Sequence, residues 1–311
     1  MAKPDFPKTL KEFRERFAEE EACYEYLMQS RWPDGIVCPR CGGLAFWRRA
    51  KRMLFQCRGC GYELSPMAGT LLQDTHMPIR EWFWAAYLVA THTPGLSAKQ
   101  LQRQMACSYK TAWYMLHRLR GGMVNEARSP LRGVVEADET IIGGPVEGLT
   151  GRGVTAARTK TLVIGAVEVV FWDKRGKGPQ EKAGRLRLAP VERADAESIG
   201  RFLRANVAPG SEIRTDGWQG YSKSALAGYR HDALPGVRAR HIHRAFGNLK
   251  TWLSGTHHGV DSKYLSRYLD EYVFRFNRRT TPMAAFQTLL GLTTARKPLG
   301  YQNLIGPEST G

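Results

Sequence analysis

The fold of this chain is decided by the stretch Val134-Val135-Glu136-Ala137-Asp138-Glu139-Thr140, a short β-prone run with Asp138 near its end. Asp216 stands in a matching context, because it follows the β-prone residues 211–215. Carboxylates that project from neighbouring strands commonly hold divalent metal ions against a phosphodiester. The pair Asp138 and Asp216 therefore predicts an enzyme that cuts or joins nucleic acid.

The periodicity around these two aspartates predicts an α/β core. Four β-prone runs are separated by Gly- and Lys-rich turns, at residues 132–142, 161–171, 185–191 and 211–215. A helical run, residues 194–205, lies between the last two. Further helical patterns cover residues 6–28, 80–120 with a break at 93–95, 262–279, and a last helix starting at Thr281-Pro282.

The charge predicts a polyanionic partner. The chain has 311 residues, with 46 Lys and Arg against 29 Asp and Glu, giving a formal net charge of +17. Phosphate contacts supply most non-specific affinity for DNA, so DNA is the expected partner. No apolar stretch approaches the roughly 18 residues of a membrane-spanning helix. The N-terminus also lacks the apolar core of a signal peptide, so we expect a cytoplasmic protein with no membrane partner.

The cysteines predict a structural zinc site. Cys38 and Cys41 form one C-x-x-C knuckle, and Cys57 and Cys60 form a second. This spacing is typical of four thiolates around one Zn²⁺. A module of this size buries little apolar surface, so metal binding would supply its folding energy. The span 38–60 also carries six basic residues and no acid, and we expect it, like the basic run 236–280, to contact DNA.

The helical segment after the cysteine module predicts a helix-turn-helix. Ser97 and Ser108 are placed as N-caps of two consecutive helices. The second helix would then read DNA. An ordinary helical hairpin that packs on the catalytic core is the alternative.

The chain resembles the DDE-type insertion-sequence transposases of the ISXO2-like kind. The motifs that carry the resemblance are the two knuckles, residues 135–140 followed by Gly143-Gly144, residues 215–218 followed by Gly220-Tyr221, residues 255–260 and residues 268–279. The resemblance implies an RNase H-like mixed sheet with flanking helices, preceded by a zinc ribbon. It also implies bacterial, nucleoid-associated DNA cleavage at terminal inverted repeats and strand transfer into target DNA. Mg²⁺ or Mn²⁺ would be the cofactor and a homo-oligomer the acting form.

The resemblance also implies a division of the chain. We expect an N-terminal helix at 1–30, the zinc ribbon at 31–68, a helical DNA-binding segment at 78–125, the catalytic domain at 130–292 and a tail at 293–311.

The third catalytic residue has two candidates. The family often has a glutamate on a helix with a lysine seven residues later, but no glutamate occurs between Glu212 and Glu271. His243 stands seven residues before Lys250, on the same helical face. Asn248 is the other candidate, because some family members use asparagine. Lys250 is expected to hold the phosphate backbone near the scissile bond. Glu136 shares a strand face with Asp138 and could support the site, but we expect an ordinary surface ion pair.

The missing third carboxylate motivates two other hypotheses. One is a DNA-binding regulator that keeps the fold without catalysis. The other is a structure-specific nuclease on the same fold.

Overall fold

The structure is a computed structural model that describes residues 5–49, 52–125, 127–143, 160–174, 178–233 and 239–305. The chain forms two compact units. Unit 1 comprises residues 1–125 and 278–311, and unit 2 comprises residues 126–277. Residues 278–292, which the sequence analysis assigned to the catalytic domain, thus belong to unit 1. Among the described residues, no helix is both long and apolar enough to cross a membrane.

Unit 1 is built on an aromatic core. Its helices α1 (Leu10–Arg16), α2 (Glu20–Arg31), α3 (Ile79–Thr91) and α10 (Pro282–Ala295) bring Phe13, Phe17, Tyr26, Phe83 and Phe286 together. The helix predicted over residues 6–28 is therefore two helices. The break after Arg16 lets Phe17 and Tyr26 both reach Phe83, which one straight helix would not allow.

A small antiparallel sheet in unit 1 contains Cys57, and Cys38, Cys41 and Cys60 lie in turns outside its strands. It consists of β1 (Phe46–Arg49), β2 (Leu54–Cys57) and β3 (Glu63–Leu64) in that order. The next elements are α4 (Ala98–Met105) and α5 (Tyr109–Gly121), with Ala106 in the left-handed region at φ 48° between them. The predicted N-caps are confirmed, because Ser97 accepts from Gln100 N and Ser108 from Thr111 N.

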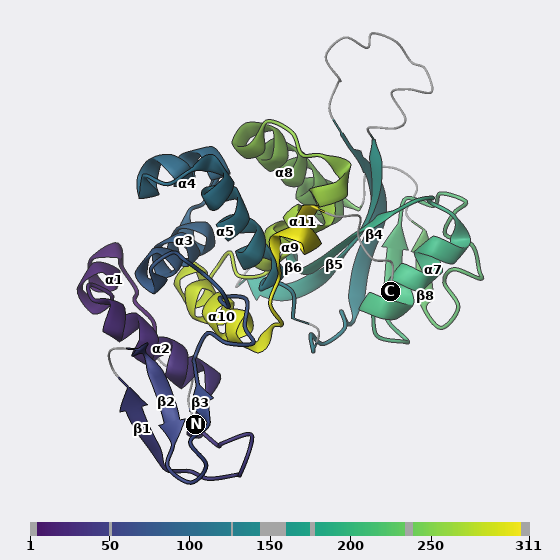
Figure 1. Cartoon of the computed structure of the whole chain (residues 1–311). Coiled ribbons are helices and arrows are strands. Elements are labelled where there is room, and N and C mark those ends of the chain that lie inside the picture. Colours follow the sequence, from purple (N-terminus) through teal and green to yellow (C-terminus); the bar gives the residue numbers. More distant parts are fainter. Residues whose placement is uncertain are drawn as a thin grey trace. The chain divides into compact units, whose positions relative to one another are not determined.

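Unit 2 contains one mixed sheet (Figure 1). Its strands are β4 (Val134–Ile142), β5 (Thr161–Lys174), β6 (Gly178–Val191), β7 (Glu212–Thr215) and β8 (Arg230–Ala233). Their order is β6-β5-β4-β7-β8; β4, β5 and β6 pair antiparallel, and β4, β7 and β8 pair parallel. The parallel pairing of β4 with β7 requires a crossover connection between them, and α7 (Ala196–Asn206) is the helix in that connection.

Helices cover both faces of this sheet, because successive apolar side chains of its strands point to opposite faces. One face packs Val135, Ala137, Ile164 and Ala166 against α7. The other face packs Val163 and Val167 against α8 (Arg240–His257) and α9 (Leu265–Phe276). Gly165 permits this approach, since a Cβ there would lie 2.8 Å from the Phe246 ring. The predicted α/β class and RNase H-like mixed sheet are confirmed.

The strand β8 was not predicted. Its residues Arg230–Ala233 are mostly polar and charged, and nothing in their sequence is typical of a strand. It forms because β7 offers a free parallel edge, with Ile213 opposite His231 and Thr215 opposite Ala233.

Candidate active site and metal centre

The four predicted zinc ligands converge in unit 1. The sulfur atoms of Cys38, Cys41, Cys57 and Cys60 all lie within 4.8 Å of one another. Each knuckle is closed locally: Gly42 N donates to Cys38 O and Gly61 N to Cys57 O. Backbone N–H groups of Cys60 and Gly59 lower the pKa of the Cys57 thiol to about 7, which favours the thiolate that zinc binds. At Cys41 a backbone hydrogen bond from Gly43 acts in the same direction, but the other three sulfurs outweigh it and raise the pKa to about 12. Four sulfurs in this arrangement fit a tetrahedral Zn²⁺.

The proposed catalytic strand β4 presents its acids to two faces. Glu136 and Asp138 point toward α8, whereas Glu139 points the other way and accepts a hydrogen bond from the Tyr221 hydroxyl at 3.0 Å. Burial raises the pKa of Asp138 and of Glu139 above their ordinary values, and that of Tyr221 well above its own. The charge of His243 acts on Asp138 in the opposite direction.

Asp216 directly follows β7, the strand that pairs with β4, and it lies close enough for its charge to act to raise the pKa of Asp138. The parallel register pairs Val134 with Glu212 and Glu136 with Arg214. Continuing this register by two residues places Asp138 beside Asp216, just past the end of β7. The Asp216 carboxylate accepts from Trp218 N at 2.9 Å, and Gly217 between them adopts φ 87°, where a side chain would be strained. This turn fixes the Asp216 side chain at the C-terminal end of β7.

Helix α8 brings His243 onto Asp138. The His243 Nε2 atom lies 2.9 Å from the Asp138 Oδ2 atom. Lys250 follows seven residues later, and at about 100° per residue it lies on nearly the same helix face. Asn248 follows five residues after His243, so it points about 140° away, and it is exposed. The structure thus joins His243, rather than Asn248, to the aspartate that the sequence singled out.

Glu136 has a different role from the one predicted. A surface ion pair was expected, but the residue is only 1% exposed. Its Oε2 atom accepts from the backbone N–H groups of His241, at 2.7 Å, and Ile242, at 3.0 Å. These N–H groups belong to the first turn of α8 and have no partner inside the helix. Glu136 therefore caps α8 and ties it to the strand of Asp138. The sequence offered one indication that Glu136 supports the site, namely its position two residues before Asp138 on the same strand face.

A charged cluster holds the same end of α8. Glu181 on β6 pairs with Arg214 at 3.0 Å and with Arg240 at 3.1 Å. Although burial acts to raise it, the pKa of Glu181 is lowered by the Arg214 hydrogen bond and by the nearby charges. The cluster thus keeps a carboxylate ionised and paired beside the first residues of α8.

Unit 1 exposes cationic and aromatic side chains on two elements. On β1, the Trp47 ring is 46% exposed, with the guanidinium groups of Arg49 and Arg58 at 5.7 and 5.6 Å from its centroid. On α5, Tyr109 and Lys110 in the first turn are exposed, whereas residues 115–120 are buried. Only the first turn of α5 is open to a partner, and recognition helices contact base edges with their N-terminal residues.

Most of unit 2 and part of unit 1 match known protein families. Residues 130–277 match the ISXO2-like transposase domain, and residues 18–63 match the transposase zinc-ribbon domain. Unit 2 therefore contains an ISXO2-like transposase domain, and unit 1 a transposase zinc-ribbon domain. It is also 25% identical over 215 residues to a protein of Halobacterium salinarum described as an uncharacterized protein in transposable element ISH50. That alignment covers 66% of this chain and 70% of the relative.

The residue ranges of the two family matches agree with the unit boundary and with the cysteine cluster of the structure. The transposase-domain match ends at Asn277, where unit 2 ends, and the zinc-ribbon match includes all four cysteines. In the resemblance motifs, Gly144 lies outside the described residues, as do Lys51 and residues 236–238 of the basic runs.

Proposed function

We propose that the chain catalyses metal-dependent DNA strand cleavage and strand transfer for an insertion sequence. One observation carries the proposal. On an RNase H-like sheet, Asp138 lies 2.9 Å from His243, which comes from a helix far along the chain, and close enough to Asp216 for the charge of Asp216 to act on its pKa. Three polar side chains from three elements meet at one end of the strands. This is the arrangement that a metal-dependent phosphoryl transferase requires.

Each of these residues has a role in the proposal. Asp138 and Asp216 would hold Mg²⁺ or Mn²⁺, for which carboxylate oxygens are suitable ligands. The bound cation would activate the attacking oxygen and stabilise the leaving oxygen of the phosphodiester. His243 holds the Asp138 carboxylate in place and completes the set of donors. Lys250, on the same side of α8, would bind the phosphate backbone. Asn248 remains the alternative third residue.

The partner we propose is DNA, both the terminal inverted repeats and the target. Support comes from the net charge of +17 and from the exposed Arg49, Arg58 and Lys110 of unit 1. Unit 1 would recognise the ends through the zinc ribbon and the first turn of α5, and unit 2 would cut them. Two ends must be held together for transfer, so the acting form would be a homo-oligomer.

A second candidate is a DNA-binding regulator without catalysis. It is favoured by one observation, that α8 offers His243 where a carboxylate is more usual for a hard cation. A structure-specific nuclease would share the geometry and differ only in the joining step.

The experiment that tests the proposal uses end-labelled DNA carrying the inverted repeats that flank the gene. Wild-type protein should cut this DNA with Mg²⁺ and join it to a target, and Asp138→Asn should do neither while still binding it. Binding without cutting by the wild type would favour the regulator. Cutting without joining would favour the nuclease.

A further inference from the structure

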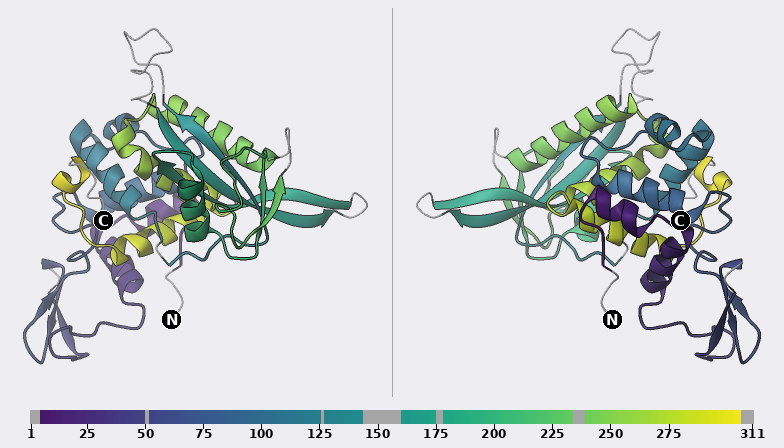
Figure 2. Two further views of the ribbon diagram at one scale, coloured as in Figure 1. Left: turned by 90° about the vertical axis from the view of Figure 1, so that its right-hand side faces the viewer. Right: turned by 90° about the vertical axis from the view of Figure 1, so that its left-hand side faces the viewer.

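The hairpin of β5 and β6 continues beyond the sheet of unit 2. The strand β4 pairs with β5 only as far as Val169, opposite Val134. The pairing of β5 with β6 continues from Val170 and Lys182 to Lys174 and Gly178. Residues 170–174 and 178–182 therefore form a two-stranded extension, which we call the ribbon arm. Figure 2 shows it reaching away from the rest of the sheet.

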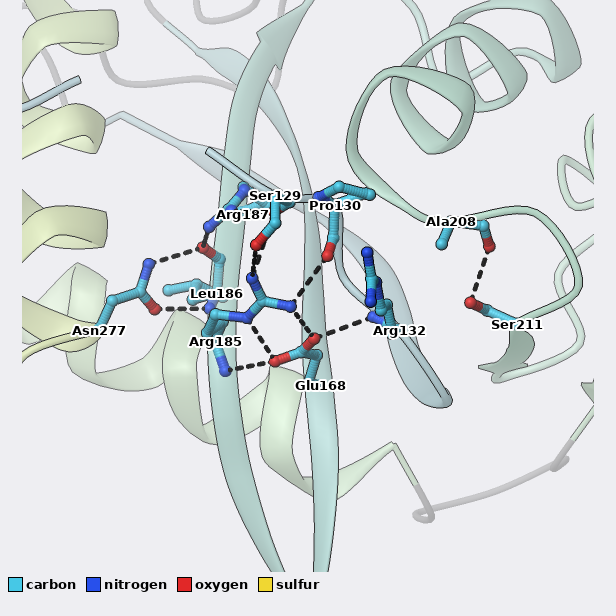
Figure 3. A network of polar contacts seen from close by, with 10 residues as sticks. All are labelled: Ser129, Pro130, Arg132, Glu168, Arg185, Leu186, Arg187, Ala208, Ser211 and Asn277. Carbon is cyan, nitrogen blue, oxygen red and sulfur yellow. Dashed lines mark hydrogen bonds and ion pairs between the residues drawn. The ribbon is translucent and has the colours of Figure 1, made fainter. Parts of the chain in front are cut away.

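The base of the ribbon arm carries an ion pair between the half-buried Arg185 and the buried Glu168 (Figure 3). The register shifts between Val167 and Val169, and Glu168 at this shift accepts from Arg185 Nε at 2.8 Å and from Arg132 N at 2.9 Å. Burial acts to raise the pKa of Glu168, but the bonds from Arg185 hold it below its ordinary value. Gly184 is needed beside it, since a Cβ there would lie 2.9 Å from Glu168 Cβ.

Residues at the start and at the end of unit 2 also form hydrogen bonds with the base of the ribbon arm. Arg185 donates to Pro130 O at 2.9 Å, and Arg187 donates to Ser129 O at 3.0 Å. The Asn277 side chain accepts from Leu186 N and donates to Leu186 O. The ribbon arm therefore starts from a rigid platform, so its direction is set by the fold.

The ribbon arm displays large apolar side chains to solvent. Val170 is 38% exposed, Phe171 49% and Trp172 42%. Val170 and Trp172 share a face with their cross-strand partners Lys182 and Gln180, whereas Phe171 lies on the opposite face, where Arg214 stacks on its ring at 5.8 Å. A two-stranded ribbon has no core to cover such residues, and adjacent exposed apolar residues mark interaction surfaces.

We propose that the face formed by Val170, Trp172 and Lys182 binds DNA, with Trp172 packing on a base or a deoxyribose. The charges support this partner. Lys182 and, near the base, Arg132 are exposed, while the acid on this side, Glu168, is neutralised by Arg185. A two-stranded ribbon also fits the width of the major groove. The inference rests on the proposed function, because it requires that the chain binds DNA.

A second copy of the chain fits this face less well. A symmetric contact would bring the same patch of both copies together, and so bury two Lys182 side chains in one interface. Like charges facing each other across an interface disfavour association. Phosphate, by contrast, complements the cations while the indole supplies a stacking surface.

The test measures the affinity of the full chain for a fluorescein-labelled DNA duplex by anisotropy over a range of salt concentrations. Trp172→Ala should weaken binding about tenfold, equivalent to about 1.4 kcal/mol, because the contact of the indole with the DNA is lost. Trp172→Phe should recover most of the loss. Lys182→Gln should lower the slope of log affinity against log salt by about one.

Phe171→Ala is the matched control, because it removes a similarly exposed aromatic ring from the other face of the same ribbon. It should change affinity by less than about twofold. Equal losses for Trp172→Ala and Phe171→Ala, or wild-type affinity for Trp172→Ala, would overturn the inference. So would a loss of dimer mass in light scattering with unchanged DNA affinity, which would assign the face to a second copy. If the wild type itself binds no DNA, the proposed function fails first.

Discussion

The zinc site of unit 1 and the proposed catalytic site of unit 2 hold metals in different ways. The four cysteines lie within residues 38–60, and each knuckle is closed by its own backbone hydrogen bonds. Asp138, Asp216 and His243 come instead from a strand, the turn after another strand, and a helix. The first site can therefore form around its ion with little help from the rest of the chain. The second exists only when the sheet and α8 are assembled. Each of the following predictions tests this difference, beginning with the largest expected effect.

Removing a zinc ligand should unfold the ribbon and leave unit 2 intact. Structural zinc contributes about 10–16 kcal/mol of apparent binding free energy in small zinc-finger peptides. We expect Cys38→Ser to abolish the one bound zinc per chain and to open residues 38–60 to proteolysis. Elemental analysis and limited proteolysis of the full chain would measure both. Cys107→Ser is the control, since Cys107 lies outside the cluster. Full zinc occupancy in Cys38→Ser would contradict the prediction.

Removing a proposed catalytic carboxylate should have the opposite effect, because DNA cleavage should be lost while the fold stays intact. Asp216→Asn keeps the shape of the side chain but loses the charge that holds a divalent ion. Cleavage should fall at least about a thousand-fold, because losing a metal costs several kcal/mol of transition-state stabilisation. DNA binding should be unchanged or stronger, because an acid near the phosphates is gone. Near-normal cleavage by this variant would refute the catalytic assignment.

The two candidates for the third residue should separate in the same assay. His243→Ala should reduce cleavage strongly, because His243 contacts Asp138 at 2.9 Å. Asn248→Ala should reduce it far less, because Asn248 points about 140° away along α8. The ratio of the two single-turnover rates is the deciding measurement. A larger loss for Asn248→Ala would reverse the assignment.

The cap of α8 should matter for catalysis, whereas an equivalent cap in unit 1 should not. Glu136 caps α8, and Glu20 caps α3 by accepting from Ile79 N and Arg80 N. Loss of a cap costs about 0.5–2 kcal/mol. We expect Glu136→Ala to lower cleavage about tenfold, equivalent to 1.4 kcal/mol, and Glu20→Ala to lower only stability.

The variant Glu136→Gln decides how that cap acts. Its carbonyl oxygen can still accept from His241 and Ile242, so it should restore most of the cleavage lost in Glu136→Ala. A Glu136→Gln variant as inactive as Asp138→Asn would mean that the charge of Glu136, rather than its hydrogen bonds, is what cleavage requires.

The smallest effect concerns a glycine on the helix of His243. A Cβ at Gly247 would meet nothing within 4 Å, so Gly247→Ala should raise the free energy of unfolding by about 0.5–1 kcal/mol. Gly200→Ala in α7 is the contrasting variant, because its Cβ would lie 2.8 Å from Arg204 Nη1 and 3.3 Å from Ala225 Cα. It should destabilise the protein. Denaturant unfolding of the two variants would show opposite signs.

The sequence by itself determined the features whose causes are local. Two C-x-x-C knuckles predict a zinc site because each tight turn brings its own sulfurs together. Ser97 and Ser108 predict the starts of α4 and α5, because a cap bonds a backbone group three residues away. Alternation and β-prone runs placed β4, β5, β6 and β7, with β5 and β6 longer than predicted. Asp138 and Asp216 were found because each is an acid in or directly after a short β-prone run, although β4 continues four residues beyond Asp138, to Ile142.

Only the tertiary structure decided what depends on distant partners. His243 was one of two candidates until α8 packed on the sheet and brought its imidazole to Asp138. The sequence places Glu136 on the strand face of Asp138, but it does not show that Glu136 caps a helix more than a hundred residues away. The strand β8 forms because β7 offers a parallel edge, not because its residues favour extended backbone, and the ribbon arm extends beyond β4 because β5 and β6 continue to pair with each other. Long-range hydrogen bonds and burial set these features, and a local pattern does not encode them.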